Sequence, residues 1–509
     1  MNKKTEFEND DILLKKIQEE IANKKSSAIE MASTFNIMHL LHLLYLFRRN
    51  RVIMMTSGKL QDDPKVINYQ IFDDAFKYAI SLVTKYGDWK CRTQYKDSFH
   101  SYNPKSLEDF LRNIISINGS FDTEQLCSVF KIRVDSEGNK EFILLDDDLS
   151  IMLRIYGLRI EKFAASSKEK TLLPEELFIK ILERYKNLAE LFKKGMSISL
   201  EDYVFGLLFL NANLKARFVN IENELHGLDV EDSDIQLYEF LKIADALIFT
   251  HNDLSLHLDD VFINFISNNA FAPLEFDQNE LRYHYITRNP FLKGQDFFIV
   301  SPDLIFDSLL DNIHYTLLEN NLTKDDYQAH CGAQFLNEVA EAVAKYGYIL
   351  VDKEVDLHIG KNKIGDIDLV LYNESREHTL LIECKCHRLP LDVYFRDRAA
   401  VESHALQNKK WEKKVTNRIN HLKSKNAQFK ISGSWDYIIV TLMPEPLAHK
   451  SHLMVLTVKE MEKWLESFPL ETSPSDFFNK TYIDEGVHFV HEDIKLLTNA
   501  GYLSAFEYI

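Results

Sequence analysis

The sequence contains little glycine, proline or cysteine. Its 509 residues include 16 glycines, 11 prolines and 5 cysteines. This composition excludes a collagen-like chain, and the 45% of hydrophobic residues excludes a largely disordered one. The cysteines are odd in number and scattered over a long chain, which argues against a disulfide framework. We therefore expect a globular protein of a reducing, cytoplasmic compartment.

An excess of positive charge is also lacking. The chain carries 60 Lys and Arg against 78 Asp and Glu, which gives a formal net charge of −18. A protein that coats nucleic acid with a uniformly basic surface is thereby excluded, although a local basic groove is not.

Long hydrophobic runs are missing as well. The most apolar run, residues 35–47, is too short for a membrane span and ends in several arginines, so a buried helix with a basic end is the better interpretation. The N-terminus is too acidic for a signal peptide. We expect no membrane partner. The sequence also contains no Walker A pattern, so an energy-coupled motor would have to be a separate protein.

Helical periodicity dominates the first 250 residues. Residues 129–134 and 141–145 interrupt it, because apolar and polar residues alternate there on both sides of a glycine-containing turn, which predicts a β-hairpin. Residues 165–174 have the composition of a linker. The expected organisation is a helical N-terminal domain with a β-hairpin (1–165), a helical middle region (166–329), a mixed domain (330–467) and a C-terminal tail (468–509).

The mixed domain shows helical and strand-like segments in the order α-β-β-β-α-β. The expected helices and strands cover residues 332–346, 348–357, 366–371, 379–385, 396–426 and 436–442, and a further strand at 454–458 and a helix at 459–467 close the domain. The predicted fold class is therefore α+β and multidomain, with a mainly helical N-terminal region followed by an αβββαβ domain.

Acidic residues and a lysine occur together on two of these predicted strands. Asp366 and Asp368 share one face of the first strand, and Glu383 and Lys385 share one face of the second, because side chains alternate along a strand. A short connection makes the two strands antiparallel neighbours. Three carboxylates at one point repel one another unless a cation lies between them, and oxygen ligands suit a hard cation such as Mg²⁺.

The lysine indicates which reaction such a site could catalyse. Lys385 could orient or deprotonate an attacking water, or stabilise charge at a phosphorus centre. A bound metal lowers the pKa of a water molecule and neutralises charge that develops on a phosphate. Together these residues predict metal-assisted hydrolysis of phosphodiester bonds.

This arrangement resembles the PD-(D/E)xK nuclease superfamily, whose signature is an acid on one strand and Glu-x-Lys on the next. The matching residues are Asp368 and Glu383-Cys-Lys385. Asp368 lies in the segment Gly-Asp-Ile-Asp-Leu-Val (residues 365–370), which is similar to a pattern of the restriction-endonuclease-like and resolvase-like branches. The resemblance implies that Asp368 and Glu383 bind Mg²⁺, which Mn²⁺ can replace, with Asp366 as an auxiliary ligand. It also implies a catalytic role for Lys385.

Two helices that flank the strands extend the resemblance, which covers residues 330–465. The family tends to place an acid on the preceding helix, where this chain has Glu338. Downstream, Gln407-Asn-Lys-Lys-Trp411 is similar to the Gln-x-x-x-Tyr motif of RecB-type nucleases, with Trp in place of Tyr. That departure leaves the role of Gln407 open.

The same downstream helix carries a run of lysines, of which the most prominent are Lys409, Lys410, Lys413 and Lys414. A charge run is usually a solvated helix face. Beside a predicted nuclease site, contact with a phosphate backbone is an equally good interpretation.

Other reactive side chains near the second strand favour structural interpretations. Cys384 and Cys386 are better interpreted as buried apolar-like cysteines than as metal ligands, because no second Cys or His pair accompanies them at zinc spacing. His378 and His387, which flank the strand, are better interpreted as loop histidines than as catalysts.

Two interpretations of the whole chain follow. In the first, it is a nuclease that acts on DNA, and its N-terminal helical region recognises the substrate, binds a protein partner or regulator, or holds the nuclease inactive. Analogy at the level of the fold suggests bacterial genome defence or DNA processing. In the second, the acidic residues form a solvated face, and the chain is a non-catalytic scaffold that binds nucleic acid or protein. The oligomeric state is open in both.

Overall fold

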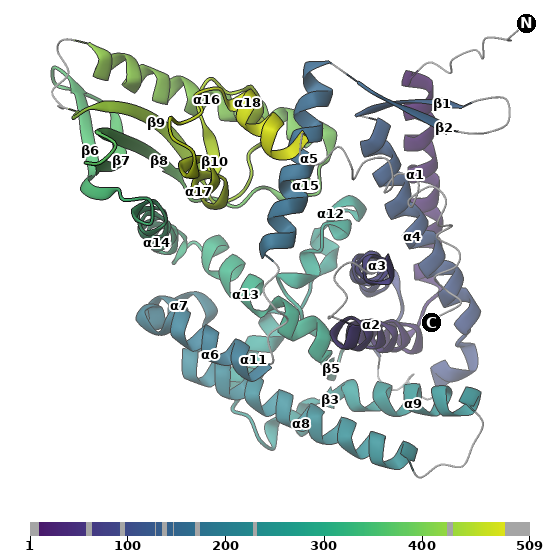
Figure 1. Cartoon of the computed structure of the whole chain (residues 1–509). Helices are drawn as coiled ribbons and strands as arrows, with labels where there is room; N and C mark the ends of the chain where they lie inside the picture. Colours follow the sequence, from purple (N-terminus) through teal and green to yellow (C-terminus); the bar gives the residue numbers. More distant parts are fainter. Residues whose placement is uncertain are drawn as a thin grey trace, which may run out of the picture. The chain divides into compact units, whose positions relative to one another are not determined.

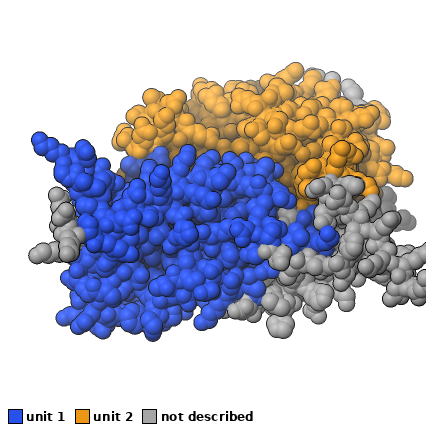
Figure 2. Space-filling model, turned by 90° about the horizontal axis from the view of Figure 1, so that it is seen from above, with its two compact units in different colours: residues 1–11, 125–168, 328–509 blue, residues 12–124, 169–327 orange. Residues whose placement is uncertain are grey.

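The chain forms two compact units (Figures 1 and 2). The computed structural model describes residues 10–57, 64–91, 97–127, 129–134, 140–145, 147–167, 174–226, 232–424 and 431–483. Unit 1 comprises residues 1–11, 125–168 and 328–509, and unit 2 comprises residues 12–124 and 169–327. Within the described residues, no helix has both the length and the apolar character needed to cross a membrane.

This division differs from the boundaries expected at residues 165 and 329. The segment 125–168, which we expected in the N-terminal domain, belongs to unit 1 with the C-terminal sheet. Its helix α5 (Asp148–Ser167) carries Arg159, which is 1% exposed and donates to both carboxylate oxygens of Glu460, at 2.7 and 2.8 Å. A buried ion pair between residues 301 positions apart cannot be inferred from local sequence.

Unit 2 is mainly helical, as expected for most of the N-terminal half. Its larger helices are α1 (Asp10–Ser33), α2 (Ile37–Ser57), α3 (Pro64–Tyr86), α4 (Pro104–Cys127), α6 (Pro174–Tyr185), α7 (Ala189–Met196), α8 (Leu200–His226), α9 (Asp232–Leu247), α11 (Asp260–Asn268) and α13 (Pro302–Glu319), with the shorter α10 (His251–Ser255) and α12 (Gln278–Arg282). A three-stranded antiparallel sheet of β3 (Ile248–Thr250), β5 (Phe297–Ile299) and β4 (Leu292–Lys293) completes it.

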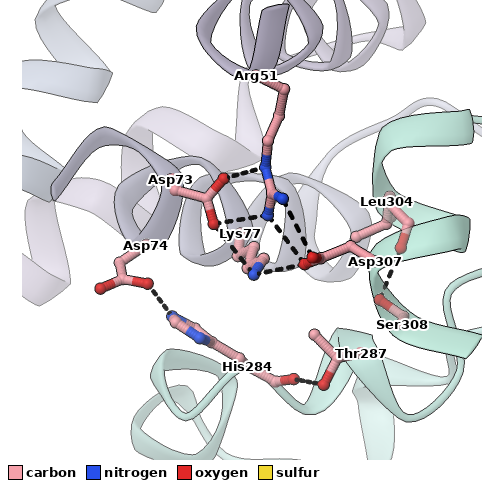
Figure 3. Close-up of polar contacts among 9 residues, drawn as sticks. All are labelled: Arg51, Asp73, Asp74, Lys77, His284, Thr287, Leu304, Asp307 and Ser308. Atoms are coloured by element: carbon pink, nitrogen blue, oxygen red, sulfur yellow. Dashed lines mark hydrogen bonds and ion pairs between the residues drawn. The ribbon is translucent and has the colours of Figure 1, made fainter. Parts of the chain in front are cut away.

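The basic end of α2 is neutralised inside unit 2 (Figure 3). Arg51 pairs with Asp73 of α3 and, at 2.9 Å, with Asp307 of α13, and Nζ of Lys77 lies 3.1 Å from both carboxylates. Burial alone would raise the pKa of Asp307, but the charges of Lys77 and Arg51 outweigh it and hold this pKa well below its ordinary value. The apolar run that precedes Arg51 is a buried helix, as the sequence predicted.

Unit 1 is built around a five-stranded sheet with the strand order β10-β9-β8-β7-β6. The strands are β6 (Ile349–Ile359), β7 (Asn362–Asn373), β8 (His378–Lys385), β9 (Ser434–Thr441) and β10 (Val455–Thr457). Strands β6, β7 and β8 are antiparallel neighbours, whereas β8, β9 and β10 run parallel to one another. The helices are α14 (Lys324–Ala344), α15 (Leu391–Tyr394), α16 (Arg398–Lys423), α17 (Val458–Glu466) and α18 (Pro474–Phe478). The α+β class and the αβββαβ order of elements are therefore confirmed.

Both faces of this sheet are covered. In Figure 1, α16 runs along one side of the sheet, and α14 and α17 lie on the other. Ile367, Leu369 and Ile382 are fully buried in the core, as the alternation of the strands predicted. Asp366, Asp368, Glu383 and Lys385 have the opposite parity, so they belong to the face covered by α16.

Two smaller elements join unit 1. The predicted hairpin is confirmed as the antiparallel pair β1 (Phe130–Val134) and β2 (Lys140–Leu144). We expected residues 468–509 to be an appended tail, but Phe478 is fully buried in the core of unit 1 and Tyr482 donates to Glu460 at 2.6 Å. The described part of this segment is thus integral to unit 1.

Candidate active site

The two acidic strands lie side by side, as the sequence predicted. Leu369 of β7 pairs with Ile382 of β8, and one further step of this antiparallel register places Asp368 opposite Glu383. The backbone pairing of the two strands ends at this point. Oδ2 of Asp368 accepts a hydrogen bond of 2.6 Å from the backbone N–H of Cys384. Strand geometry and this hydrogen bond fix the position of the first acid.

Glu383 is buried and paired with two cations. It is 5% exposed, and Nζ of Lys385 donates to its Oε1 at 2.6 Å. Arg418 of α16 donates to its Oε2, and the hydroxyl of Tyr437 on β9 lies 3.5 Å from the same oxygen. Both carboxylate oxygens of Glu383 therefore have cationic partners within the protein.

Arg418 and Tyr437 are the residues that sequence reasoning missed. Arg418 follows the lysine run on the same helix, yet it is only 6% exposed. Helical spacing offers a signal, because Arg418 falls in register with the buried residues Val415 and Leu422, whereas the lysines do not. Tyr437 alternates with core residues along β9 and had no comparable signal in the sequence.

A glycine makes room for the arginine. Gly365 has φ +136°, in the region that favours glycine, and a Cβ added there would collide with the guanidinium of Arg418. The glycine of the Gly-Asp-Ile-Asp segment thus serves both the backbone conformation before Asp366 and the approach of Arg418 to Glu383.

The electrostatics of the two other acids differ. Burial, followed by the charge of Glu383, raises the pKa of Asp368 to about 6, although the N–H of Cys384 and the charge of Lys385 oppose the shift. Asp366 is more open, with 39% of its side chain exposed, and its carboxylate lies 3.6 Å from both Arg418 and Lys363. Negative charge at Asp368 is therefore poorly compensated, whereas Asp366 has cations nearby.

The donor chemistry of Asp368 and Glu383 fits a hard divalent cation. Both offer carboxylate oxygens, and the raised pKa of Asp368 reports a negative charge that a cation would relieve. Glu383 already accepts from Lys385 and Arg418, so a metal would share its oxygens with these cations or displace one of them. Within the described residues, the three groups gathered closely enough to hold a metal as they stand are instead His387, His404 and Glu445.

The two flanking residues of the predicted site lie elsewhere. Glu338 is exposed on α14, on the other side of the sheet, where burial and the charges of Glu341 and Glu462 raise its pKa. Gln407 is exposed on the outer side of α16, whereas the neighbouring Asn408 is buried. The structure therefore brings together the four strand residues, and neither Glu338 nor Gln407 joins them.

The lysines of α16 form an exposed basic face. Lys409, Lys410, Lys413 and Lys414 are all exposed, opposite the buried side that carries Arg418. Cys384 and Cys386 pack against the hydrophobic core of unit 1, in line with their structural interpretation. The basic face thus lies on the side of α16 that points away from the acidic residues of the sheet.

No protein-family model matches the chain, and neither the curated proteins nor the solved structures searched give a match.

Proposed function

We propose that the chain is a metal-dependent nuclease that hydrolyses phosphodiester bonds of DNA. The observation that carries the proposal is the placement of Asp368 opposite Glu383 on β7 and β8, with Lys385 in hydrogen-bond contact with Glu383. The αβββαβ order of elements around these residues supports it, because the same order and signature occur together in the superfamily that the sequence resembles.

Each residue of the strand pair has a distinct role in this proposal. Asp368 and Glu383 would hold Mg²⁺ or Mn²⁺, which when bound supplies an acidified water and neutralises charge on the phosphate. The N–H of Cys384 orients Asp368 through the hydrogen bond to Oδ2. Lys385, 28% exposed and held by Glu383, can reach an incoming phosphate and stabilise the charge that develops on it.

Other parts of the chain would serve substrate binding and control. The exposed lysines of α16 offer a basic surface in a protein of net charge −18, and they would contact the DNA backbone. Unit 2 would recognise the substrate or a protein partner, or restrain the nuclease. A role in bacterial genome defence or DNA processing belongs to the same proposal.

One observation favours a second candidate, a scaffold that retains a nuclease-like fold without turnover. Arg418 and Lys385 already occupy both oxygens of Glu383. If these pairs persist and keep Mg²⁺ from the carboxylate, the chain would only bind nucleic acid or protein.

A cleavage assay separates the two candidates. Wild type would be incubated with plasmid and single-stranded DNA in Mg²⁺, in Mn²⁺ and in EDTA. For the nuclease we expect metal-dependent cleavage, lowered roughly 100-fold or more by Asp368→Asn and by Lys385→Ala. Asp352→Asn on β6 and Lys361→Ala in the β6–β7 turn are matched controls, because both side chains are exposed and neither belongs to the proposed site.

The two possible failures have different meanings. Cleavage that persists in both site variants would contradict the assignment of Asp368 and Lys385. Wild type that binds DNA but cleaves neither substrate under any metal condition would favour the scaffold.

A further inference from the structure

Beyond the ends of β8 and β9, two histidines lie against a buried glutamate. The two strands are parallel, and Lys385 at the end of β8 pairs with Thr441 at the end of β9. The segments that follow therefore leave the sheet at the same edge, where ligand sites of such sheets commonly form. His387 lies on the first segment and Glu445 on the second, and His404 approaches from the first half of α16.

The side chains converge closely. Nε2 of His404 lies 2.9 Å from Oε2 of Glu445, and Nε2 of His387 lies 2.9 Å from Oε1. The ligand atoms of the three residues all lie within 4.8 Å of one another. Glu445 is 1% exposed and His404 is 8% exposed, whereas His387 keeps 30% of its side chain exposed. The cluster is thus closed except on the side of His387.

Three buried polar atoms of this cluster make no hydrogen bond with the described part of the chain. They are Oε1 of Glu445, Nε2 of His387 and Oδ1 of Asn408. The first two are close to each other, but not in a direction that makes a hydrogen bond. Buried polar atoms in folded proteins are nearly always paired, so three such atoms in one place indicate that a further group completes the cluster.

Neighbouring residues hold Glu445 in place independently of the histidines. Nδ2 of Asn408, one turn after His404 on α16, donates to Oε2 of Glu445 at 2.7 Å. Nη1 of Arg159 donates to the backbone oxygen of Glu445, also at 2.7 Å. Supporting contacts of this kind orient the ligands of metal sites and tune their affinity. They also leave the carboxylate itself without a guanidinium or ammonium partner among the described residues.

We propose that His387, His404 and Glu445 bind a divalent transition-metal ion of the zinc class. Two imidazole nitrogens and one carboxylate form a common ligand set for Zn²⁺, whereas Mg²⁺ prefers oxygen alone. The ion provides the positive charge that a carboxylate this deeply buried requires. This site goes beyond the proposed nuclease centre, since it shares no ligand with Asp368 or Glu383.

The position of the site gives it a structural consequence. The ion ties the segments after β8 and β9 to α16, the helix that also carries Arg418. His387 flanks the second acidic strand, which in the sequence favours a loop histidine over a catalyst. The three ligands come from three separate segments, so only the fold brings them together.

Metal binding by the full-length chain, prepared without a histidine tag and stripped with a chelator, tests the proposal. After the stripped protein has been incubated with Zn²⁺ and dialysed, we expect wild type to retain one Zn²⁺ at this site, measured by elemental analysis. Co²⁺ in its place should give visible d–d absorption. Glu445→Gln and His387→Ala should weaken binding at least about 100-fold, and Asn408→Ala roughly 10- to 100-fold. His452→Ala, an exposed histidine, and Asp368→Asn should bind as wild type does.

Several results would overturn the proposal. One is wild type that retains no more Zn²⁺ than His387→Ala, with the same Co²⁺ spectrum. Another is loss of the ion in Asp368→Asn but not in His387→Ala, because the ion would then belong to the strand acids. Should Glu445→Gln fail to fold, the partly exposed His387 still gives the decisive comparison. Since no readout depends on cleavage, an inactive nuclease and an absent zinc site are distinguishable.

Discussion

Arg418 of α16 donates a hydrogen bond to the buried carboxylate of Glu383 on β8. The guanidinium thereby occupies an oxygen that the proposed nuclease centre would use to bind a metal. A cation from the protein and a cation from solution compete for the same charge, so the strength of this pair decides how readily Glu383 can act as a ligand.

Replacing Arg418 by methionine should destabilise unit 1. Glu383 would keep Lys385 but lose its second partner, and breaking a buried pair on one side costs on the order of 3 kcal/mol of unfolding free energy. Arg398→Met is the matched control on the same helix, because Arg398 forms an exposed pair with Glu402 at 3.0 Å. We expect its effect to be about 0.5 kcal/mol or less.

Urea unfolding of both variants in EDTA and in Mg²⁺ measures these changes. If Glu383 can bind a metal once Arg418 is gone, Mg²⁺ should restore part of the stability of Arg418→Met and little of that of the Arg418→Met/Asp368→Asn double variant. Equal stabilities of Arg418→Met and Arg398→Met in EDTA would contradict the energetic importance of the buried pair.

Gly365→Ala should be more harmful than Gly360→Ala, although both glycines have positive φ. At Gly360, with φ +60°, a Cβ meets nothing within 4 Å, so only backbone strain of roughly 1 kcal/mol is expected. At Gly365 the Cβ also collides with Arg418, and we expect a further loss of about 1–3 kcal/mol. The difference between the two unfolding free energies reports the contact with Arg418 together with the greater backbone strain at φ +136°. Similar losses in the two variants would contradict both contributions.

The sequence was sufficient to predict the sheet and its acidic residues, because the signals are local. Alternation places Ile367 and Ile382 in the core and their acidic neighbours on the other face, and a short turn makes β7 and β8 pair. These features depend on residues only a few positions apart.

The partners of the acidic residues could not be predicted in the same way. Arg418 lies 35 positions after Glu383, on a helix rich in exposed lysines. Its sequence neighbours therefore do not indicate that Arg418 points into the core. Likewise, Arg159 pairs with Glu460, which is 301 positions away in the sequence, and this contact joins α5 to the rest of unit 1. Contacts of this kind follow from tertiary packing, and neither composition nor periodicity specifies them.

The contribution of Asp368 to the stability of wild type should decrease between about pH 4 and pH 6. Its pKa is about 6 in the folded chain against an ordinary value near 4, so over this interval the folded state binds more protons than the unfolded state. The contribution of Asp368 to the unfolding free energy then falls as pH rises and levels off above pH 6. Asp368→Asn removes this loss, so it should become more stable than wild type by roughly 1–3 kcal/mol as pH increases from 4 to 7 in EDTA.

Denaturant unfolding across this range provides the measurement. Asp352→Asn, with the same change of charge at an exposed position of β6, should show no comparable trend. Mg²⁺ should reduce the advantage of Asp368→Asn at pH 7, since bound metal stabilises the ionised carboxylate. An advantage of Asp368→Asn that stays constant from pH 4 to pH 7 would contradict a raised pKa.

DNA binding should depend on the exposed lysines of α16. Reversing the charge of Lys409 and Lys413, one turn apart on the exposed face, removes up to two phosphate contacts. Each contact with duplex DNA contributes about 0.9 to the slope of log K against log salt, so the variant Lys409→Glu/Lys413→Glu should bind more weakly and with a smaller slope. Anisotropy of a labelled duplex in EDTA, where no cleavage occurs, measures both quantities. The control Lys193→Glu/Lys194→Glu on α7 has the same change of net charge at exposed positions of unit 2. Binding that weakens equally in the two variants would indicate a general effect of net charge and exclude α16 as the binding face.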